Sequence, residues 1–182
     1  MKRTFLLLLV LVVLASACKR REQASQTRGG QPAQSQQTTT GSDLGSTMPE
    51  YSATTLDGAK FDLAARRDKV VLLNLWATWC GPCRFEIPEL QKMHTEYGPK
   101  GFEVIGVSVD EGGPDPVKQF VKEHEMTYPV VLDPEGKLAN LFQTSVLPTT
   151  ALIDRKGRIV WKHYGLIEAN DATLKQAIEK AL

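Results

Sequence analysis

The feature that most constrains this chain is a nearly unbroken apolar run over residues 70–77 that leads into the tetrapeptide Cys80-Gly81-Pro82-Cys83. An apolar run of this length is typical of a central strand that is buried on both faces of an α/β sheet. Proline suits the first turn of a helix, because the N–H that it lacks would have no partner there. The segment therefore predicts a buried strand that delivers Cys80 to the N-terminus of a helix.

The remainder of residues 48–182 alternates between apolar runs and amphipathic stretches. Strands that alternate with helices and end in a hairpin predict an α/β fold, with a central mixed sheet flanked by helices. The expected elements are a hairpin around Asp57-Gly58, a helix over 81–97, a strand over 102–109, a helix over 115–125, a strand over 129–132, a helix near 138–142, a hairpin of 149–153 with 158–163, and a final helix capped by Asp171.

Two cysteines at positions i and i+3 in the first turn of a helix can reach disulfide distance. The unpaired N–H groups and the positive dipole end at a helix N-terminus favour a thiolate at the first of them. We therefore expect Cys80 to be the attacking sulfur and Cys83, which lies one turn deeper, to be the resolving thiol.

Other uses of a cysteine pair fit the sequence less well. A zinc site needs two more ligands, but Cys18 is distant and His94, His124 and His163 form no closely spaced pair. A c-type haem site needs a histidine directly after the second cysteine, where this chain has Arg84. We therefore predict no metal and no cofactor. A static structural disulfide stays open as an alternative, although so small a loop restricts the unfolded chain little.

The segment from Asn74 to Cys83 resembles the active-site segment of the thioredoxin superfamily. Its continuation through Arg84-Phe85-Glu86-Ile87-Pro88-Glu89-Leu90 resembles the membrane-tethered ResA/TlpA branch, which is related to the redoxin and AhpC/TSA proteins, and residues 146–154 match a second family signature. The resemblance implies a thioredoxin-like fold over residues 48–182, with an N-terminal hairpin and a central strand–helix insert at about 110–144.

The resemblance also implies where substrate is bound. It implies a cis peptide bond between Leu147 and Pro148, packed beside the two sulfurs, in a loop that offers backbone groups to an extended substrate. Trp79, Gly81 and Pro82, which surround the first cysteine, are expected to complete the substrate-binding surface. An ordinary trans proline before an edge strand is the alternative for Pro148.

Glu86 is three residues past Cys83 on the same helical face, and the ResA-like relatives carry a glutamate here that tunes the thiols. A neighbouring carboxylate raises the pKa of a thiol and can relay its proton. The alternative is a solvent-facing helix acid. Asn74 replaces the buried aspartate of cytosolic thioredoxins, so we expect Glu86 to take over its acid–base role. In the insert, we expect His124, Tyr128 and Asp133 to serve packing or the surface, with shaping of a groove as the alternative.

The N-terminus has a different character. Two basic residues precede an apolar run over residues 5–15, which is well short of the ~20 residues that span a bilayer as a helix. We therefore predict a signal peptide over residues 1–17. Leu14-Ala15-Ser16-Ala17-Cys18 resembles the lipobox of bacterial lipoproteins, which implies cleavage before Cys18 and lipidation of its sulfur and amine. A chance cysteine after an ordinary signal peptide is the alternative.

Residues 18–47 are rich in Gln, Ser, Thr and Gly, which predicts a lipid-anchored disordered linker. The protein would then be a membrane-anchored lipoprotein that faces the periplasm or the cell exterior. The whole chain has 22 Lys and Arg against 21 Asp and Glu, so it shows no basic footprint for nucleic acid.

The leading functional hypothesis is a thiol–disulfide oxidoreductase that acts on protein disulfides, in the reducing direction. The resemblance implies a membrane electron donor of the DsbD/CcdA kind and, as a typical family task, reduction of the haem-binding cysteines of apocytochrome c. One alternative is a peroxide reductase of the peroxiredoxin type, whose motif has a threonine three residues before the cysteine, where this chain has Ala77. Another is a tethered thioredoxin-fold binding module with a static disulfide.

Overall fold

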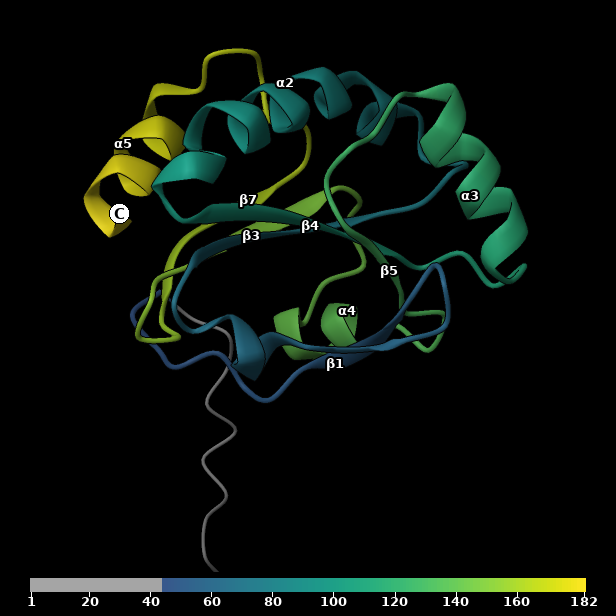
Figure 1. The fold of residues 1–182 in the computed structure, drawn as a ribbon, viewed down its shortest axis with the longest axis horizontal. Helices are drawn as coiled ribbons and strands as arrows, with labels where there is room; N and C mark the ends of the chain where they lie inside the picture. The colour runs from purple at the N-terminus through teal and green to yellow at the C-terminus, as the bar shows by residue number, and fades with distance from the viewer. Residues whose placement is uncertain (1–43) are drawn as a thin grey trace, which may run out of the picture. The chain divides into compact units, whose positions relative to one another are not determined.

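The computed structural model describes residues 44–182, which form a seven-stranded mixed sheet in the order β2-β1-β5-β4-β3-β6-β7 (Figure 1). The predicted signal peptide, Cys18 and most of the predicted linker lie outside the described residues. In chain order the elements are β1 (Ser52–Thr55), β2 (Lys60–Asp62), the 3-10 helix η1 (Leu63–Arg66), β3 (Val70–Trp76), α2 (Gly81–Tyr97), the 3-10 helix η2 (Gly98–Lys100), β4 (Phe102–Ser108), α3 (Pro114–Glu123), β5 (Val130–Leu132), α4 (Lys137–Phe142), β6 (Thr149–Ile153), β7 (Ile159–Tyr164) and α5 (Ala172–Ala181).

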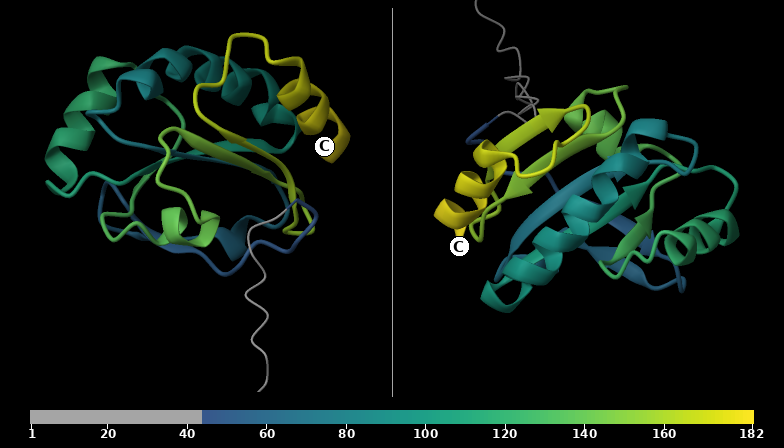
Figure 2. Two further views of the ribbon diagram at one scale, coloured as in Figure 1. Left: turned by 180° about the vertical axis from the view of Figure 1, so that it is seen from behind. Right: turned by 90° about the horizontal axis from the view of Figure 1, so that it is seen from above.

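Strand β3 lies near the centre of the sheet, and all seven of its residues are buried. It pairs in parallel with β4 and antiparallel with β6, so its backbone is hydrogen-bonded on both sides. Helices α2, α3 and α5 cover one face of the sheet, and α4 lies over the other, while the β1–β2 hairpin forms the edge beside β5 (Figures 1 and 2). This arrangement explains why the strand is apolar along its whole length rather than at alternate positions.

Alternation along β3 decides which side chain meets which helix. Val70, Leu72 and Trp76 belong to the core cluster that also contains the buried side chains of α2, α3 and α5. Their odd-numbered neighbours, such as Leu73, belong to the cluster on the α4 face. Asn74 has the same parity as the first group, so its side chain points toward α2.

The fold class predicted from the sequence, an α/β thioredoxin-like fold with an N-terminal hairpin and a central strand–helix insert, is confirmed. The peptide bond between Leu147 and Pro148 is cis, as the resemblance implied. Residues 45–47 already contact the domain, because Gly45 N–H donates to Ile159 C=O and Thr47 bridges to Arg158. Domain contacts therefore begin before Met48, inside the predicted linker. Within residues 44–182 no helix is long and apolar enough to cross a bilayer.

Candidate active site

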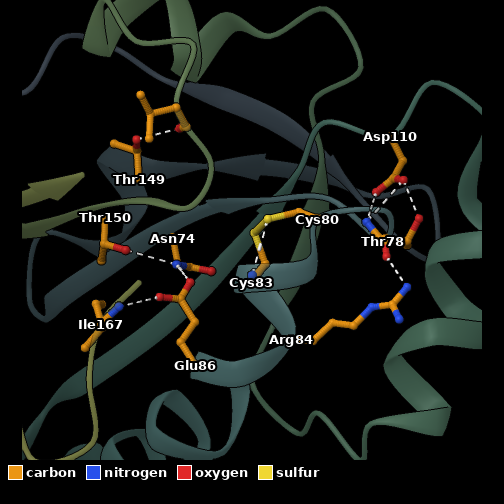
Figure 3. The surroundings of a disulfide bond; sticks show 11 residues. Asn74, Thr78, Cys80, Cys83, Arg84, Glu86, Asp110, Thr149, Thr150 and Ile167 are labelled. Carbon is orange, nitrogen blue, oxygen red and sulfur yellow. Dashed lines mark hydrogen bonds between the residues drawn. A yellow bond between two sulfur atoms is a disulfide. The ribbon is translucent and has the colours of Figure 1, made fainter. Parts of the chain in front are cut away.

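The two sulfurs lie where β3 gives way to α2. Cys80 is the N-cap of α2, and its Sγ accepts a hydrogen bond from the Cys83 N–H at 3.3 Å. The two cysteines are joined by a disulfide, with Cα atoms 5.4 Å apart (Figure 3). The exposed fraction is 5% for Cys80 and 1% for Cys83, so the first sulfur is the more accessible of a largely covered pair. This is the placement expected of an attacking and a resolving thiol.

The loop that carries Cys80 is held from two sides, by residues that the sequence did not single out. The buried carboxylate of Asp110, just after β4, accepts from the Thr78 N–H at 3.0 Å and from the Thr78 hydroxyl at 2.6 Å (Figure 3). It also accepts from the Ser108 hydroxyl at 2.7 Å. From the first turn of α2, Arg84 donates to the Thr78 C=O at 2.9 Å. The backbone two residues before Cys80 is thus tied to both β4 and α2.

Glu86 is fully buried, one turn along α2 from Cys83, and its carboxylate is held at both oxygens (Figure 3). Asn74 Nδ2 donates to Oε1 at 2.7 Å, and the Ile167 N–H donates to Oε2 at 3.1 Å. Asn74 Nδ2 also lies 3.0 Å from Thr150 Oγ1 on β6. The alternative of a solvent-facing acid at position 86 is therefore wrong.

Burial raises the pKa of Glu86 to about 7, and the hydrogen bonds from Ile167 and Asn74 only partly oppose that rise. A carboxyl group with such a pKa holds or releases its proton near neutral pH, which is what a proton relay needs. Burial and, next, the Glu86 charge also raise the pKa of the Tyr128 hydroxyl. The sequence showed that Glu86 follows Cys83 by one turn, but not that Asn74 and the Ile167 amide would meet it.

The cis-proline loop lies beside the segment that leads to the disulfide. Leu75 on β3 is paired with Thr149 on β6, so Pro148, which directly precedes Thr149, lies near the end of β3. The Pro148 C=O accepts from the Gly165 N–H at 2.8 Å, which ties this loop to the one after β7. Sequence reasoning placed Leu147-Pro148 here but missed the Gly165 contact.

Exposed apolar side chains come from each of the segments around the disulfide. Trp79 is 68% exposed and Phe85 is 77% exposed, at the start of α2. Val146 precedes the cis-proline loop, and Leu166 follows β7. Gly81 and Pro82 are also exposed. Of the five substrate-binding residues predicted from the resemblance, Trp79, Gly81 and Pro82 thus face solvent, Leu147 is half-buried, and Pro148 is buried.

The residues singled out in the insert have packing roles. The His124 ring stacks on Phe120, with ring centroids 3.9 Å apart. Asp133 is buried, caps α4 through the backbone N–H groups of Lys137 and Leu138, and accepts from the Tyr51 hydroxyl. Among residues 44–182, no group of three or more His, Cys, Asp or Glu side chains is placed to share a metal ion.

Comparison with known proteins agrees with this geometry. Residues 44–162 match the model of the AhpC/TSA family. The chain is 37% identical over 122 residues to the thiol-disulfide oxidoreductase ResA of Bacillus cereus, which covers 67% of this chain and 70% of the relative. A thiol:disulfide interchange protein of the thioredoxin family from Chlorobium tepidum has a TM-score of 0.64 at 29% identity, over 76% of this chain and 97% of that one.

A lipoprotein has a similar structure. The pneumococcal exposed lipoprotein thioredoxin of Streptococcus pneumoniae has a TM-score of 0.61 at 29% identity, over 71% of this chain and 98% of that one. Together with the family model and the ResA relatives, these matches confirm the resemblance seen at the two cysteines. The chain belongs to the AhpC/TSA family of the thioredoxin superfamily, and within it to the ResA/TlpA-like thiol–disulfide oxidoreductases.

Proposed function

We propose that this oxidoreductase uses Cys80 and Cys83 to reduce protein disulfides outside the cytoplasm, where Cys18 anchors it to a membrane. The observation that carries the proposal is the Cys80–Cys83 pair at the N-terminus of α2, one helical turn above a buried carboxyl group with a pKa of about 7. The first sulfur then has a helix end that favours its thiolate, and the second has a proton acceptor one turn along the same helix.

The reaction begins with both cysteines reduced. The Cys80 thiolate attacks one sulfur of the substrate disulfide, forms a mixed disulfide, and expels the other substrate sulfur as a thiolate, which takes up a proton. Cys83 then transfers its proton to Glu86 and attacks Cys80 Sγ, which releases the second substrate thiolate. The substrate gains two electrons, and the enzyme ends with the closed Cys80–Cys83 disulfide.

A further turnover needs a dithiol donor, and by family resemblance we propose a membrane protein of the DsbD/CcdA kind. The same resemblance supports apocytochrome c, with its haem-binding cysteines, as a substrate. The apolar side chains around the disulfide, among them Trp79, Phe85 and Val146, suit an extended polypeptide better than a small polar molecule.

Export and anchoring are supported by the sequence. The basic, apolar and small-residue order of residues 1–17 followed by Cys18 fits a lipoprotein signal, and a structurally similar pneumococcal protein is an exposed lipoprotein. Incorporation of labelled palmitate that is lost in Cys18→Ser tests the anchor. Equal labelling of the two chains would refute it.

Trapping tests the dithiol chemistry. In Cys83→Ser the mixed disulfide on Cys80 should persist, and mass spectrometry of the captured adducts identifies the substrates. Cys80→Ser is the matched control and should capture nothing. Equal yields from both variants would contradict the assigned roles. Absence of adducts together with fast oxidation of Cys80 by hydrogen peroxide would favour the peroxide-reducing alternative.

A further inference from the structure

Charge is divided unevenly over residues 44–182. This region carries sixteen Lys and Arg and nineteen Asp and Glu, so its formal net charge is negative. Half of the basic residues nevertheless lie at one end of the sheet, around the β6–β7 turn, the start of β3 and β4, and the end of α5. We call the predicted lipid-anchored linker the tether and this end of the sheet the tether-side face. The basic residues of this face are Arg66, Arg67, Lys69, Lys100, Arg155, Lys156, Arg158 and Lys180.

Contacts between these segments place them together. Arg155 donates to the Lys100 C=O at 3.1 Å, and a Cβ added to Gly157 would lie 4.0 Å from Arg67 Nε. The acids here are Glu50, Asp68, Glu96, Glu103, Asp154 and Glu179. Glu103 and Asp154 are buried and ion-paired with basic residues of the face. The tether-side face therefore has a formal charge of +2, and the rest of the described domain has −5.

The positive charge is concentrated around a groove between the β6–β7 turn and α5. Arg155, Lys156, Arg158 and Lys180 line it, all of them exposed. The acid in its lining, Asp154, is 7% exposed and bound by Arg158 Nε and Nη2. We call this the basic groove. Arg158 neutralises that acid, so the groove keeps the charges of Arg155, Lys156 and Lys180 at the surface.

The chain enters the described domain at this groove. Gly45 lines it and donates to the Ile159 C=O at 2.7 Å. The 43 residues before the described part therefore join the domain at the edge of the tether-side face. Leu44, 65% exposed, and Val160, 36% exposed, add apolar side chains to the same region.

The dithiol lies at the other end of the sheet. Strand β3 runs from Val70, next to the tether-side face, to Trp76, next to the Cys80 loop, and a strand of seven residues is about 20 Å long. The β6–β7 turn and the C-terminal end of α5 lie together at the end away from the α2 N-terminus (Figure 1). A surface that held the tether-side face would leave the disulfide pointing away from it.

We propose that the basic groove and the tether-side face dock on an anionic lipid surface, the membrane to which the tether leads, with lipid phosphates between Arg155, Lys156, Arg158 and Lys180. This inference rests on the membrane anchoring at Cys18 that is part of the proposed function. Three features support a lipid occupant: the predicted linker enters the domain at the groove, the charge is complementary to phosphate headgroups, and apolar Leu44 and Val160 flank the groove. Each Lys or Arg near an anionic bilayer contributes enough to strengthen binding about fivefold.

Docking on this face would fix the orientation of the domain relative to the membrane. The docked domain turns its dithiol outward, toward soluble protein substrates, and must leave the surface to meet a donor within the membrane. A few screened charges give a weak and reversible attraction, which allows the domain to leave the surface.

The test uses residues 18–182, the chain expected after removal of the signal peptide, in its oxidised form with Cys18→Ser, so that neither the signal peptide, lipidation nor thiol exchange enters the measurement. A fluorophore sensitive to bilayer contact is attached through Gln176→Cys, in the basic groove, or through Ser145→Cys, near the cis-proline loop. On vesicles containing phosphatidylglycerol, the label at position 176 should report the bilayer and that at position 145 should not. Phosphatidylcholine vesicles, or about 1 M salt, which shortens the screening length to about 3 Å, should abolish the signal.

Charge variants identify the surface. Lys156→Gln with Lys180→Gln removes two cations whose ammonium groups make no hydrogen bond or ion pair within residues 44–182, and should weaken the docking signal about 25-fold. Lys118→Gln with Lys122→Gln, on α3, removes the same charge elsewhere and should leave it unchanged. Equal loss in both pairs, or equal signals from the two labels, would overturn the proposal. Free inorganic phosphate that saturates the groove without vesicle docking would also overturn it, because the groove would then bind a soluble anion.

Discussion

At the scale of residues, the site depends on where its buried acid stands. Asn74 occupies the strand position that holds an aspartate in cytosolic thioredoxins, and the acid stands instead at Glu86 on the facing helix. Because Asn74 donates to Glu86 Oε1, it supports a charge that a second carboxylate there would repel. The proposed proton acceptor thus belongs to the same helix as the proposed resolving thiol.

The raised pKa of Glu86 makes stability depend on pH. Its pKa is about 7 in the folded protein against an ordinary 4.5, so between these values the folded state keeps a proton that the unfolded chain has lost. Stability therefore falls as pH rises through this window, by roughly 3 kcal/mol. Glu86→Gln should remove this fall in the free energy of unfolding, because a glutamine side chain does not ionise. The Asn74 amide can flip, so that its oxygen accepts a hydrogen bond from the glutamine NH₂ group.

Urea unfolding of the oxidised protein at about pH 5 and about pH 8 measures the effect. Glu89→Gln changes a neighbouring buried acid on the same helix and serves as the control, because it keeps Glu86 and should therefore keep the fall with pH that Glu86 causes. If the free energy of unfolding falls by the same amount in Glu86→Gln and in the unchanged chain, another group is responsible for the pH dependence.

At the scale of elements, the β3–β4 pair must allow bulky side chains to pack beneath the dithiol. The indole ring of Trp76, at the end of β3, reaches over Gly106 of β4, and its centroid lies 5.0 Å from that of the Phe120 ring. Its Nε1 is buried without a hydrogen-bond partner among the described residues. The indole ring is therefore held by packing alone, and the space above Gly106 is part of that packing.

Gly106→Ala should destabilise the domain by about 1–3 kcal/mol, as overpacking of a filled core does. Its Cβ would lie 2.9 Å from Trp76 Nε1 and 3.2 Å from Tyr128 Cε2, so both rings would have to move. Gly98→Ala is the matched control, because no atom lies within 4 Å of its added Cβ and its φ of −50° suits any residue. Thermal unfolding compares the two, and equal midpoints would contradict the packing argument.

At the scale of the whole molecule, the redox direction depends on what the fold places around the two sulfurs. A strong oxidant such as DsbA owes its potential to a stabilised reduced form. Here the helix N-terminus favours the Cys80 thiolate, while the buried carboxyl group of Glu86 disfavours negative charge beneath it. The opposing effects should keep the reduced form from being strongly stabilised.

We therefore expect a reduction potential more negative than about −200 mV, on the reducing side of the thioredoxin-fold proteins. Equilibration with dithiothreitol mixtures, followed by alkylation of free thiols, measures it. Glu86→Gln should shift the potential in the oxidising direction, because it removes the carboxylate that opposes the thiolate. A value near about −120 mV would identify an oxidant and contradict the proposed direction.

Local patterns in the sequence determined much of this molecule. The apolar run of β3, the Asp57-Gly58 turn and the periodicity of α3 depend on side chains close together in the chain, and the observed elements match them to within a residue or two. The order Cys80-Gly81-Pro82-Cys83 at a strand–helix junction likewise placed the dithiol at the α2 N-terminus, because a helix end supplies its own unpaired N–H groups.

Only the tertiary structure decided what surrounds that dithiol. Glu86 meets Asn74 because β3 turns its even-numbered side chains toward α2, and it meets the Ile167 N–H because a loop 81 residues later crosses the same helix. The hydrogen bonds from Thr78 to Asp110 and the basic groove similarly join segments that are far apart in sequence. Such contacts depend on strand order, register and burial together, and a carboxyl group acquires a pKa near neutrality only when the folded chain removes it from water.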